Sequence, residues 1–269
     1  MYKLLLVTDR EEVRDVFLRI TEWKNMHFHP ITILSDVTQA IEYLETNSVD
    51  AVGYSVCFSD VAPLHQYLVE RRPSLPIFQT HQHDETLRTE LERVRSFLDR
   101  MHMDYSDEDY DEEAVLQYLR DELVHQLLAG EVKSAEELKS RLKLVRVEIV
   151  FTAPCFVFDF DMPQGEVYLS DRWRYGRERL ANALRTNFFG RFIEGIYYGV
   201  AVLTPRHIRL IAFQRCSAQD ADTEKVLQQV LQRVRTVVND IKQYLDLDLD
   251  LQEYKVLPNI YSLTEDQTI

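Results

Sequence analysis

The stretch Asp50-Ala-Val-Gly-Tyr-Ser-Val56 combines a leading aspartate, a short apolar run and a serine where that run ends. Such a run, bounded by polar residues, is typical of a buried β-strand. Similar runs lie on both sides of it, each followed by apolar residues at helical spacing. We expect strands at 3–7, 31–34, 51–56 and 76–79, and helices at 11–23, 37–44, 63–71 and 86–98. This alternation predicts an α/β fold, with a parallel sheet covered by helices on both faces.

The composition of the chain limits the classes of protein to which it can belong. With 269 residues, of which 45% are hydrophobic, it can bury a large core, and two domains are expected. No apolar run is long enough to span a membrane and the N-terminus does not resemble a signal peptide, so we expect a cytoplasmic protein without membrane contact. The three cysteines lie far apart in apolar surroundings, which favours reduced core residues over a disulfide or metal framework: Cys57, Cys155 and Cys216.

The formal net charge of -14 disfavours direct binding of nucleic acid, because phosphate contacts require clustered Lys or Arg. One segment is rich in arginine, but its arginines are spread around the apolar residues of a helix expected at 171–192. We interpret them as the solvated face of that helix: Arg172, Arg174, Arg177, Arg179, Arg185 and Arg191.

Polar residues stand where the predicted parallel strands end. In such sheets the functional crevice lies at the carboxyl ends of the strands. The residues at these ends are Thr8 and Asp9, Ser55 and Val56, and Thr80 and His81.

The segments "LLLVTDREEV" (4–13), "DAVGYSV" (50–56), "LPIFQTH" (75–81) and "DYSDEDYDEEAV" (104–115) carry a family resemblance. In order and spacing they resemble the receiver domain of two-component response regulators, over roughly residues 1–120. The resemblance implies a flavodoxin-like fold. It also implies paired acids that hold Mg²⁺, an aspartate that accepts phosphate, a Thr or Ser that senses it and a Lys that pairs with it.

The sequence departs from this pattern at the acids. Thr8 stands at one acidic position and only Asp9 remains, so the cation site has lost oxygen-ligand charge. Ser55 replaces the acceptor aspartate, and an acyl phosphate cannot form on a hydroxyl. We therefore expect a pseudo-receiver that is not phosphorylated on aspartate, with Ser55 as the vestigial acceptor position.

The other family positions differ as well. Glu108 takes the place of the lysine, where a carboxylate would repel phosphate, and His81 occupies the switch position, one residue beyond Thr80. Two alternatives stay open: a divalent ion held by Asp9 with the acids at 107–109, and modification of Ser55 by a kinase.

A helical linker is predicted after this domain. Helices are expected at 111–130, which Gly130 ends, and at 134–145, where Ser134 and Glu137 form a capping box. The first helix has an apolar stripe close to heptad form, with Val115, Leu116, Leu119, Leu123, Leu127 and Leu128. The stripe could be the seam of a homodimer, and packing against its own domain explains it equally well.

The pattern changes after residue 147. We expect a strand at 155–162, the helix at 171–192, a hairpin at 197–214 that turns between Thr204 and His207, a helix at 223–245 and a strand at 249–256. This order predicts an α+β antiparallel sheet with helices on one side, of the ferredoxin-like or nucleotide-cyclase kind. The domains are then 1–110, 111–146 and 147–269.

The linker and this last domain resemble the central region of AraC-type response regulators, whose domain is similar to GGDEF diguanylate cyclases. Asp159 and Asp161 fit the metal-binding strand of that family. The turn, however, reads Thr204-Pro205-Arg206-His207 and lacks the glycines and acids that cyclase chemistry needs, so Asp159, Asp161, Thr204 and Arg206 are expected to be vestigial. The family binds DNA through a C-terminal helix-turn-helix region that residues 1–269 do not include, so we expect either the regulatory portion of a longer transcription factor or a protein that signals through contacts.

The sequence thus predicts a signalling and transcription-regulatory module that is not an enzyme, binds no metal or cofactor and acts through dimerisation or partner binding. Two alternatives are a divergent nucleotide-processing enzyme that uses Asp159 and Asp161, and a small-molecule sensor with a ligand beneath Trp173 and Tyr197.

Overall fold

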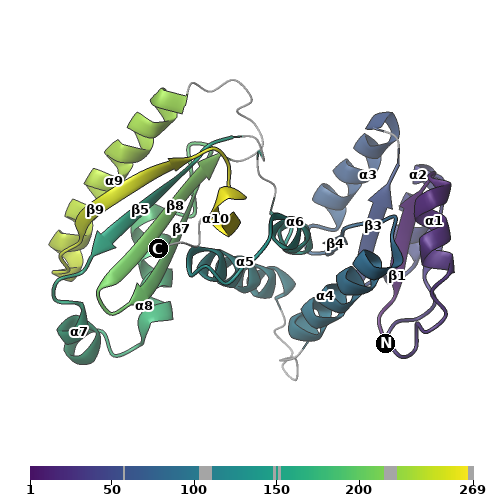
Figure 1. Cartoon of the computed structure of the whole chain (residues 1–269), viewed down its shortest axis with the longest axis horizontal. Coiled ribbons are helices and arrows are strands. Elements are labelled where there is room, and N and C mark those ends of the chain that lie inside the picture. Colours follow the sequence, from purple (N-terminus) through teal and green to yellow (C-terminus); the bar gives the residue numbers. More distant parts are fainter. Residues whose placement is uncertain (57, 103–110, 148–149, 151–152, 215–222, 266–269) are drawn as a thin grey trace. The chain divides into compact units, whose positions relative to one another are not determined.

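A computed structural model describes residues 1–56, 58–102, 111–147, 150, 153–214 and 223–265 of the chain (Figure 1). It contains two compact units. Unit 1 comprises Met1–Arg120 and Lys139–Val147, and unit 2 comprises Asp121–Leu138 and Glu148–Ile269. The residues of the predicted linker, 111–146, are shared between the two units.

Unit 1 contains a parallel sheet, as predicted. Its strands are β1 (Leu4–Thr8), β2 (Thr32–Leu34), β3 (Ala51–Ser55) and β4 (Ile77–Phe78), in the spatial order β2-β1-β3-β4. Every pairing in this sheet is parallel. The residues that would align with a fifth receiver strand, 104–108, lie outside the described part of the chain.

Four helices alternate with these strands: α1 (Glu11–Leu18), α2 (Val37–Thr46), α3 (Phe58–Arg71) and α4 (Asp84–His102). The first was predicted to continue to residue 23 and ends at Leu18 instead. The chain turns there because Phe28 forms a bridge with Tyr2, and Trp23 packs edge-on against Phe28.

The core of unit 1 explains the sequence of β3. Alternate residues Leu5, Val7 and Val52 pack against the buried residues of α2 and α3. Gly53 faces Phe78, and a Cβ at this glycine would lie 2.2 Å from the Phe78 ring. The glycine in the central strand therefore makes room for an aromatic side chain of the neighbouring strand.

Helices α5 (Glu112–Leu128) and α6 (Ala135–Leu144) follow. Ser134 accepts a hydrogen bond from the Glu137 amide, as the predicted capping box requires. Nearly all of the apolar stripe of α5 is buried within the chain, since Leu116, Leu119, Leu123, Leu127 and Leu128 are each at most 5% exposed. The stripe therefore packs against the chain itself, which was the alternative to a dimer seam.

Unit 2 is built on an antiparallel sheet. Its strands are β5 (Cys155–Asp161), β6 (Phe192–Ile193), β7 (Ile196–Thr204), β8 (His207–Gln214) and β9 (Asp250–Leu257), in the order β6-β7-β8-β5-β9. Every pairing is antiparallel. The predicted hairpin and last strand are confirmed, whereas the short β6 was not predicted.

The helix predicted at 171–192 is wrong as one continuous element. The segment contains the end of a short π-helix, η1 (Tyr168–Arg172), then α8 (Arg177–Ala183) and a second π-helix, η2 (Leu184–Phe189). Gly176, at a φ of 86°, interrupts it before α8. Its arginines do not form one solvated face either, because Arg185 is 4% exposed and bonds to Asp121.

Helices cover both faces of this sheet, so the prediction of helices on one side is wrong. On one face, Phe156, Phe158 and Phe160 of β5 belong to a core that includes residues of α8 and of α9 (Thr223–Leu245). On the opposite face, Gly199 of β7 faces Val124 of α5 so closely that a Cβ would lie 2.4 Å from that side chain. Two short helices complete the unit, α7 (Gly165–Val167) and α10 (Ser262–Glu265).

Candidate functional site

The first candidate site lies where β1 and β3 end in unit 1. Thr8 and Ser55 are register partners in the parallel pair. The Thr8 side chain is buried, and its hydroxyl donates a hydrogen bond of 2.7 Å to the Ser55 carbonyl oxygen. The same hydroxyl accepts a 3.1 Å bond from the Arg10 amide. Thr8 thus ties the two strand ends together with a donor that an ionised carboxylate lacks.

The remaining receiver positions are only partly assembled at this strand end. Asp9 is exposed directly after Thr8, and Ser55 is half-buried. Glu108 and the other acids of the alternative ion site, 107–109, lie outside the described residues. Within the described ranges, no group of three or more His, Cys, Asp or Glu side chains is arranged to hold a metal ion.

The end of β4 leads to a buried carboxylate that the sequence did not single out. Glu90 of α4 is fully buried. It accepts hydrogen bonds from the Gln79 amide at 2.9 Å and from the Ser140 hydroxyl at 2.6 Å. The His81 imidazole lies 3.8 Å away, and Arg93 donates at 3.4 Å. The predicted switch residue His81 therefore lies beside an internal carboxylate, while Thr80 is half-buried next to it in sequence.

This arrangement keeps Glu90 ionised. Burial raises the pKa of its carboxyl, but the interactions with His81, Ser140 and the Gln79 amide outweigh burial and hold the pKa below its usual range. Ser140 lies on α6, so the carboxylate connects the end of β4 to the linker segment that belongs to unit 1.

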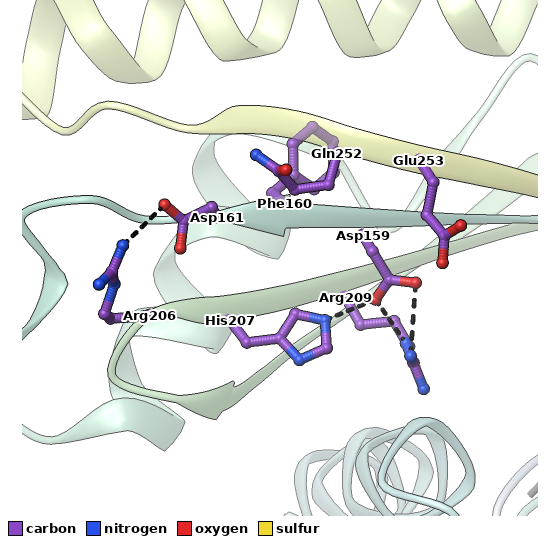
Figure 2. Close-up of a pocket in the computed structure, with 8 residues that line it drawn as sticks. All are labelled: Asp159, Phe160, Asp161, Arg206, His207, Arg209, Gln252 and Glu253. Atoms are coloured by element: carbon purple, nitrogen blue, oxygen red, sulfur yellow. Dashed lines mark hydrogen bonds and ion pairs between the residues drawn. The ribbon is translucent and has the colours of Figure 1, made fainter. Parts of the chain in front are cut away.

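The second candidate site is a pocket of about 390 Å³ in unit 2 (Figure 2). Three strands and the hairpin turn supply its lining, and it is open to solvent. The lining residues are Asp159, Phe160, Asp161, Arg206, His207, Arg209, Gln252 and Glu253. Three of the four positions predicted from the cyclase resemblance, Asp159, Asp161 and Arg206, therefore lie together.

Asp159 is the centre of this pocket. One of its carboxylate oxygens lies 2.6 Å from His207 Nε2 and 2.8 Å from Arg209 Nε, and the other accepts from Arg209 Nη2 at 3.3 Å. Arg209 also donates to the carbonyl oxygen of Leu128, the last residue of α5. Burial raises the pKa of Asp159, but the hydrogen bonds from Arg209 and His207 lower it further than burial raises it.

The strand register produces this cluster. Asp159 lies directly opposite Arg209 on β8, and Asp161 lies opposite His207. Side chains that face each other across antiparallel strands are close enough to pair. Arg209 and His207 alternate with Ile208 and Leu210, which point into the core on the other face.

The hairpin turn is closed by local contacts. Arg206 donates to Asp161 at 3.2 Å, and its backbone amide bonds to the Thr204 hydroxyl. Thr204 stabilises the turn and is not among the lining residues. A Cβ at Gly165 would lie 1.7 Å from the Pro205 carbonyl oxygen, so the turn packs closely on α7.

The chemistry available in the pocket follows from these pairs. The oxygens of Asp159 are occupied by a guanidinium and an imidazole, and Asp161 is paired with a guanidinium. A metal ion bound here would have to displace these cations. Sequence reasoning missed Arg209, His207 and Glu253, and the signal for Arg209 was a charged residue within a strand whose neighbours are apolar.

No protein-family model and no curated protein matches the sequence. In the described part of the chain, no helix combines the length and the apolar character needed to cross a membrane. The structure itself shows a mixed α/β protein with one parallel and one antiparallel sheet.

Proposed function

We propose that the chain is a non-enzymatic signalling module of the response-regulator type, with a pseudo-receiver in unit 1 and a cyclase-like domain without cyclase activity in unit 2. It acts by associating with other proteins. The observation that carries the proposal is that Thr8 in unit 1, and Asp159 and Asp161 in unit 2, are bonded to groups of the chain itself.

In unit 1, the hydroxyl of Thr8 bonds to the Ser55 carbonyl oxygen at the position where a receiver would hold a metal. His81 lies 3.8 Å from the Glu90 carboxylate, so the switch position has a charged neighbour in the interior. In unit 2, Asp159 carries its own cations, Arg209 and His207. The bonds of Thr8 and Asp159 would have to break before a phosphate or metal could take their place.

The test is incubation of the full chain with acetyl phosphate and Mg²⁺, followed by intact-mass measurement. The expected result is no added phosphoryl group. Stoichiometric incorporation that Ser55→Ala or Asp9→Asn abolishes would contradict the proposal. Ser96→Ala, an exposed serine on α4, is the matched control.

A nucleotide-processing enzyme is the second candidate, because His207 is oriented by a carboxylate in an open pocket. Such a pair is the arrangement of a general base. Incubation with GTP or ATP and Mg²⁺ or Mn²⁺ tests it. Product formation that His207→Gln abolishes would favour the enzyme, and no turnover favours the signalling module.

A further inference from the structure

The outermost strand of unit 2 presents an unusual edge. β9 is the last strand in the order β6-β7-β8-β5-β9, so one of its edges pairs with no strand among the described residues (Figure 1). Backbone N–H and C=O groups at such an edge are available for pairing with another strand.

Three apolar side chains of β9 are exposed along this edge. Leu251, Tyr254 and Val256 are 44%, 46% and 45% exposed. They lie opposite Phe160, Phe158 and Phe156 of β5, whose side chains belong to the core face. Tyr254 stacks on Phe158 with ring centroids 5.7 Å apart, which fixes its ring at the margin of the sheet. The exposed residues therefore extend the core face of the sheet beyond β5.

The sequence of β9 is complementary to itself. In a two-fold antiparallel pair, one residue must lie opposite its own copy at the axis. With Tyr254 at the axis, Glu253 lies opposite Lys255 of the second copy, and this pair occurs twice. With Lys255 at the axis, like charges would oppose each other. With Glu253 there, two carboxylates would do so. The register centred on Tyr254 is the one that places opposite charges together.

A β-bulge limits the length of this pairing. The β5–β9 register shifts between Asp159 and Phe160, which lie opposite Glu253 and Leu251, so Gln252 is the extra residue. The regular part of the edge runs from Glu253 to Leu257, so a pairing centred on Tyr254 is regular from Glu253 to Lys255 and meets the bulge beyond Glu253.

We infer that β9 pairs antiparallel with β9 of a second copy of this chain, with Tyr254 at the two-fold axis, to form one sheet across a homodimer. The proposed function says only that the chain associates with other proteins, whereas the β9 pairing names the surface that does so. The pairing holds whether or not the chain catalyses a reaction. Since Glu253 lines the Asp159 pocket, the pairing places Lys255 of the second copy at the rim of that pocket (Figure 2).

Sedimentation equilibrium of the full chain tests the inference. The wild type is expected to show a reversible, concentration-dependent dimer. Lys255→Glu places carboxylates opposite each other at both pairs and should weaken the dimer about tenfold or more. Adding Glu253→Lys to the same chain reverses both charges and should restore it. Lys225→Glu, on the exposed start of α9, changes the net charge equally and should have no effect.

A second measurement uses cysteine cross-linking, with circular dichroism to verify folding. Tyr254→Cys should form a covalent dimer on mild oxidation, whereas Tyr244→Cys, at a 71% exposed position of α9, should not. A monomeric wild type, or a dimer that Lys255→Glu leaves unchanged, would overturn the inference. Phosphorylation or nucleotide turnover would instead contradict the proposed function and leave this surface intact.

Discussion

The strand ends of unit 1 and the Asp159 pocket of unit 2 both contain polar side chains that bond within the chain, but the groups involved differ in charge. At Thr8 the chain has a neutral hydroxyl that bonds to the Ser55 carbonyl oxygen. At Asp159 it has a carboxylate that is paired with Arg209 and His207. The neutral Thr8 hydroxyl contributes one modest hydrogen bond to stability. The buried Asp159 carboxylate is stable only while its cationic partners are present, so the stability of unit 2 depends on those partners. The two regions should therefore respond very differently to substitution.

The largest effect is expected for Arg209→Met, which removes the bidentate partner of Asp159. Breaking a buried ion pair costs about 3 kcal/mol or more, and Asp159 would lose both guanidinium bonds and keep the contact with His207. The chain contains two tryptophans, and Trp23→Phe leaves Trp173 as the reporter of unit 2 in urea denaturation.

The control for this prediction is Arg209→Met combined with Asp159→Asn, which also removes the charge. The double variant should regain part of the lost stability. A loss below about 1 kcal/mol in the single variant would mean that the pair behaves like a surface salt bridge.

Thr8→Val should have a smaller effect, in unit 1. The substitution keeps the shape of the side chain and removes the hydroxyl that bonds to the Ser55 carbonyl oxygen. A net loss of about 1 kcal/mol is expected, measured through Trp23 in a Trp173→Phe background. Thr46→Val, at the exposed end of α2, is the matched control and should change stability little. A loss of unfolding free energy as large as that of Arg209→Met would show that the hydrogen bond of Thr8 and the ion pair of Asp159 contribute equally to stability.

The Asp159 carboxylate should also make the stability of unit 2 sensitive to acid. The pKa of Asp159 is lowered in the fold, so the unfolded state binds more protons near its ordinary pKa of 3.8. The stability that this carboxylate contributes is present above that value and is lost as the pH falls through the folded pKa. Unfolding free energies of unit 2 in this range should depend less on pH in Asp159→Asn than in the wild type. Parallel curves would contradict the assignment.

The smallest effect is expected for Arg206→Ala. Its ion pair with Asp161 is exposed, with the two side chains 57% and 29% accessible. Solvent-exposed pairs contribute about 0.5 kcal/mol or less, so the urea midpoint of unit 2 should barely change. A loss comparable to that of Arg209→Met would show that the hairpin turn, and not Asp159, organises the pocket.

Periodicity predicted most of the fold because the buried residues of each element follow its own repeat. β1, β3 and α9 lie within one or two residues of their predicted limits. The helix predicted at 171–192 failed because its apolar spacing continues across Gly176, where a positive φ and flanking π-turns break the helix. Periodicity records which residues are buried and does not record these local changes in backbone hydrogen bonding.

The sites were harder to predict because they depend on contacts between distant elements. Asp159 was found through a motif, but its partner Arg209 is defined by the β5–β8 register. Glu90 left a local signal, since it lies one helical turn from Leu87 and Val94 on the apolar face of α4. That its carboxylate bonds to Ser140 required the tertiary structure.

Titration of the isotope-labelled full chain with Mn²⁺, followed by NMR, tests most directly whether either candidate site holds a divalent ion. Paramagnetic broadening would report an ion at either site in one experiment. We predict no saturable, selective loss of signals from residues next to Asp9 or Asp159. Saturable broadening around either aspartate, abolished by its substitution with asparagine, would contradict the account.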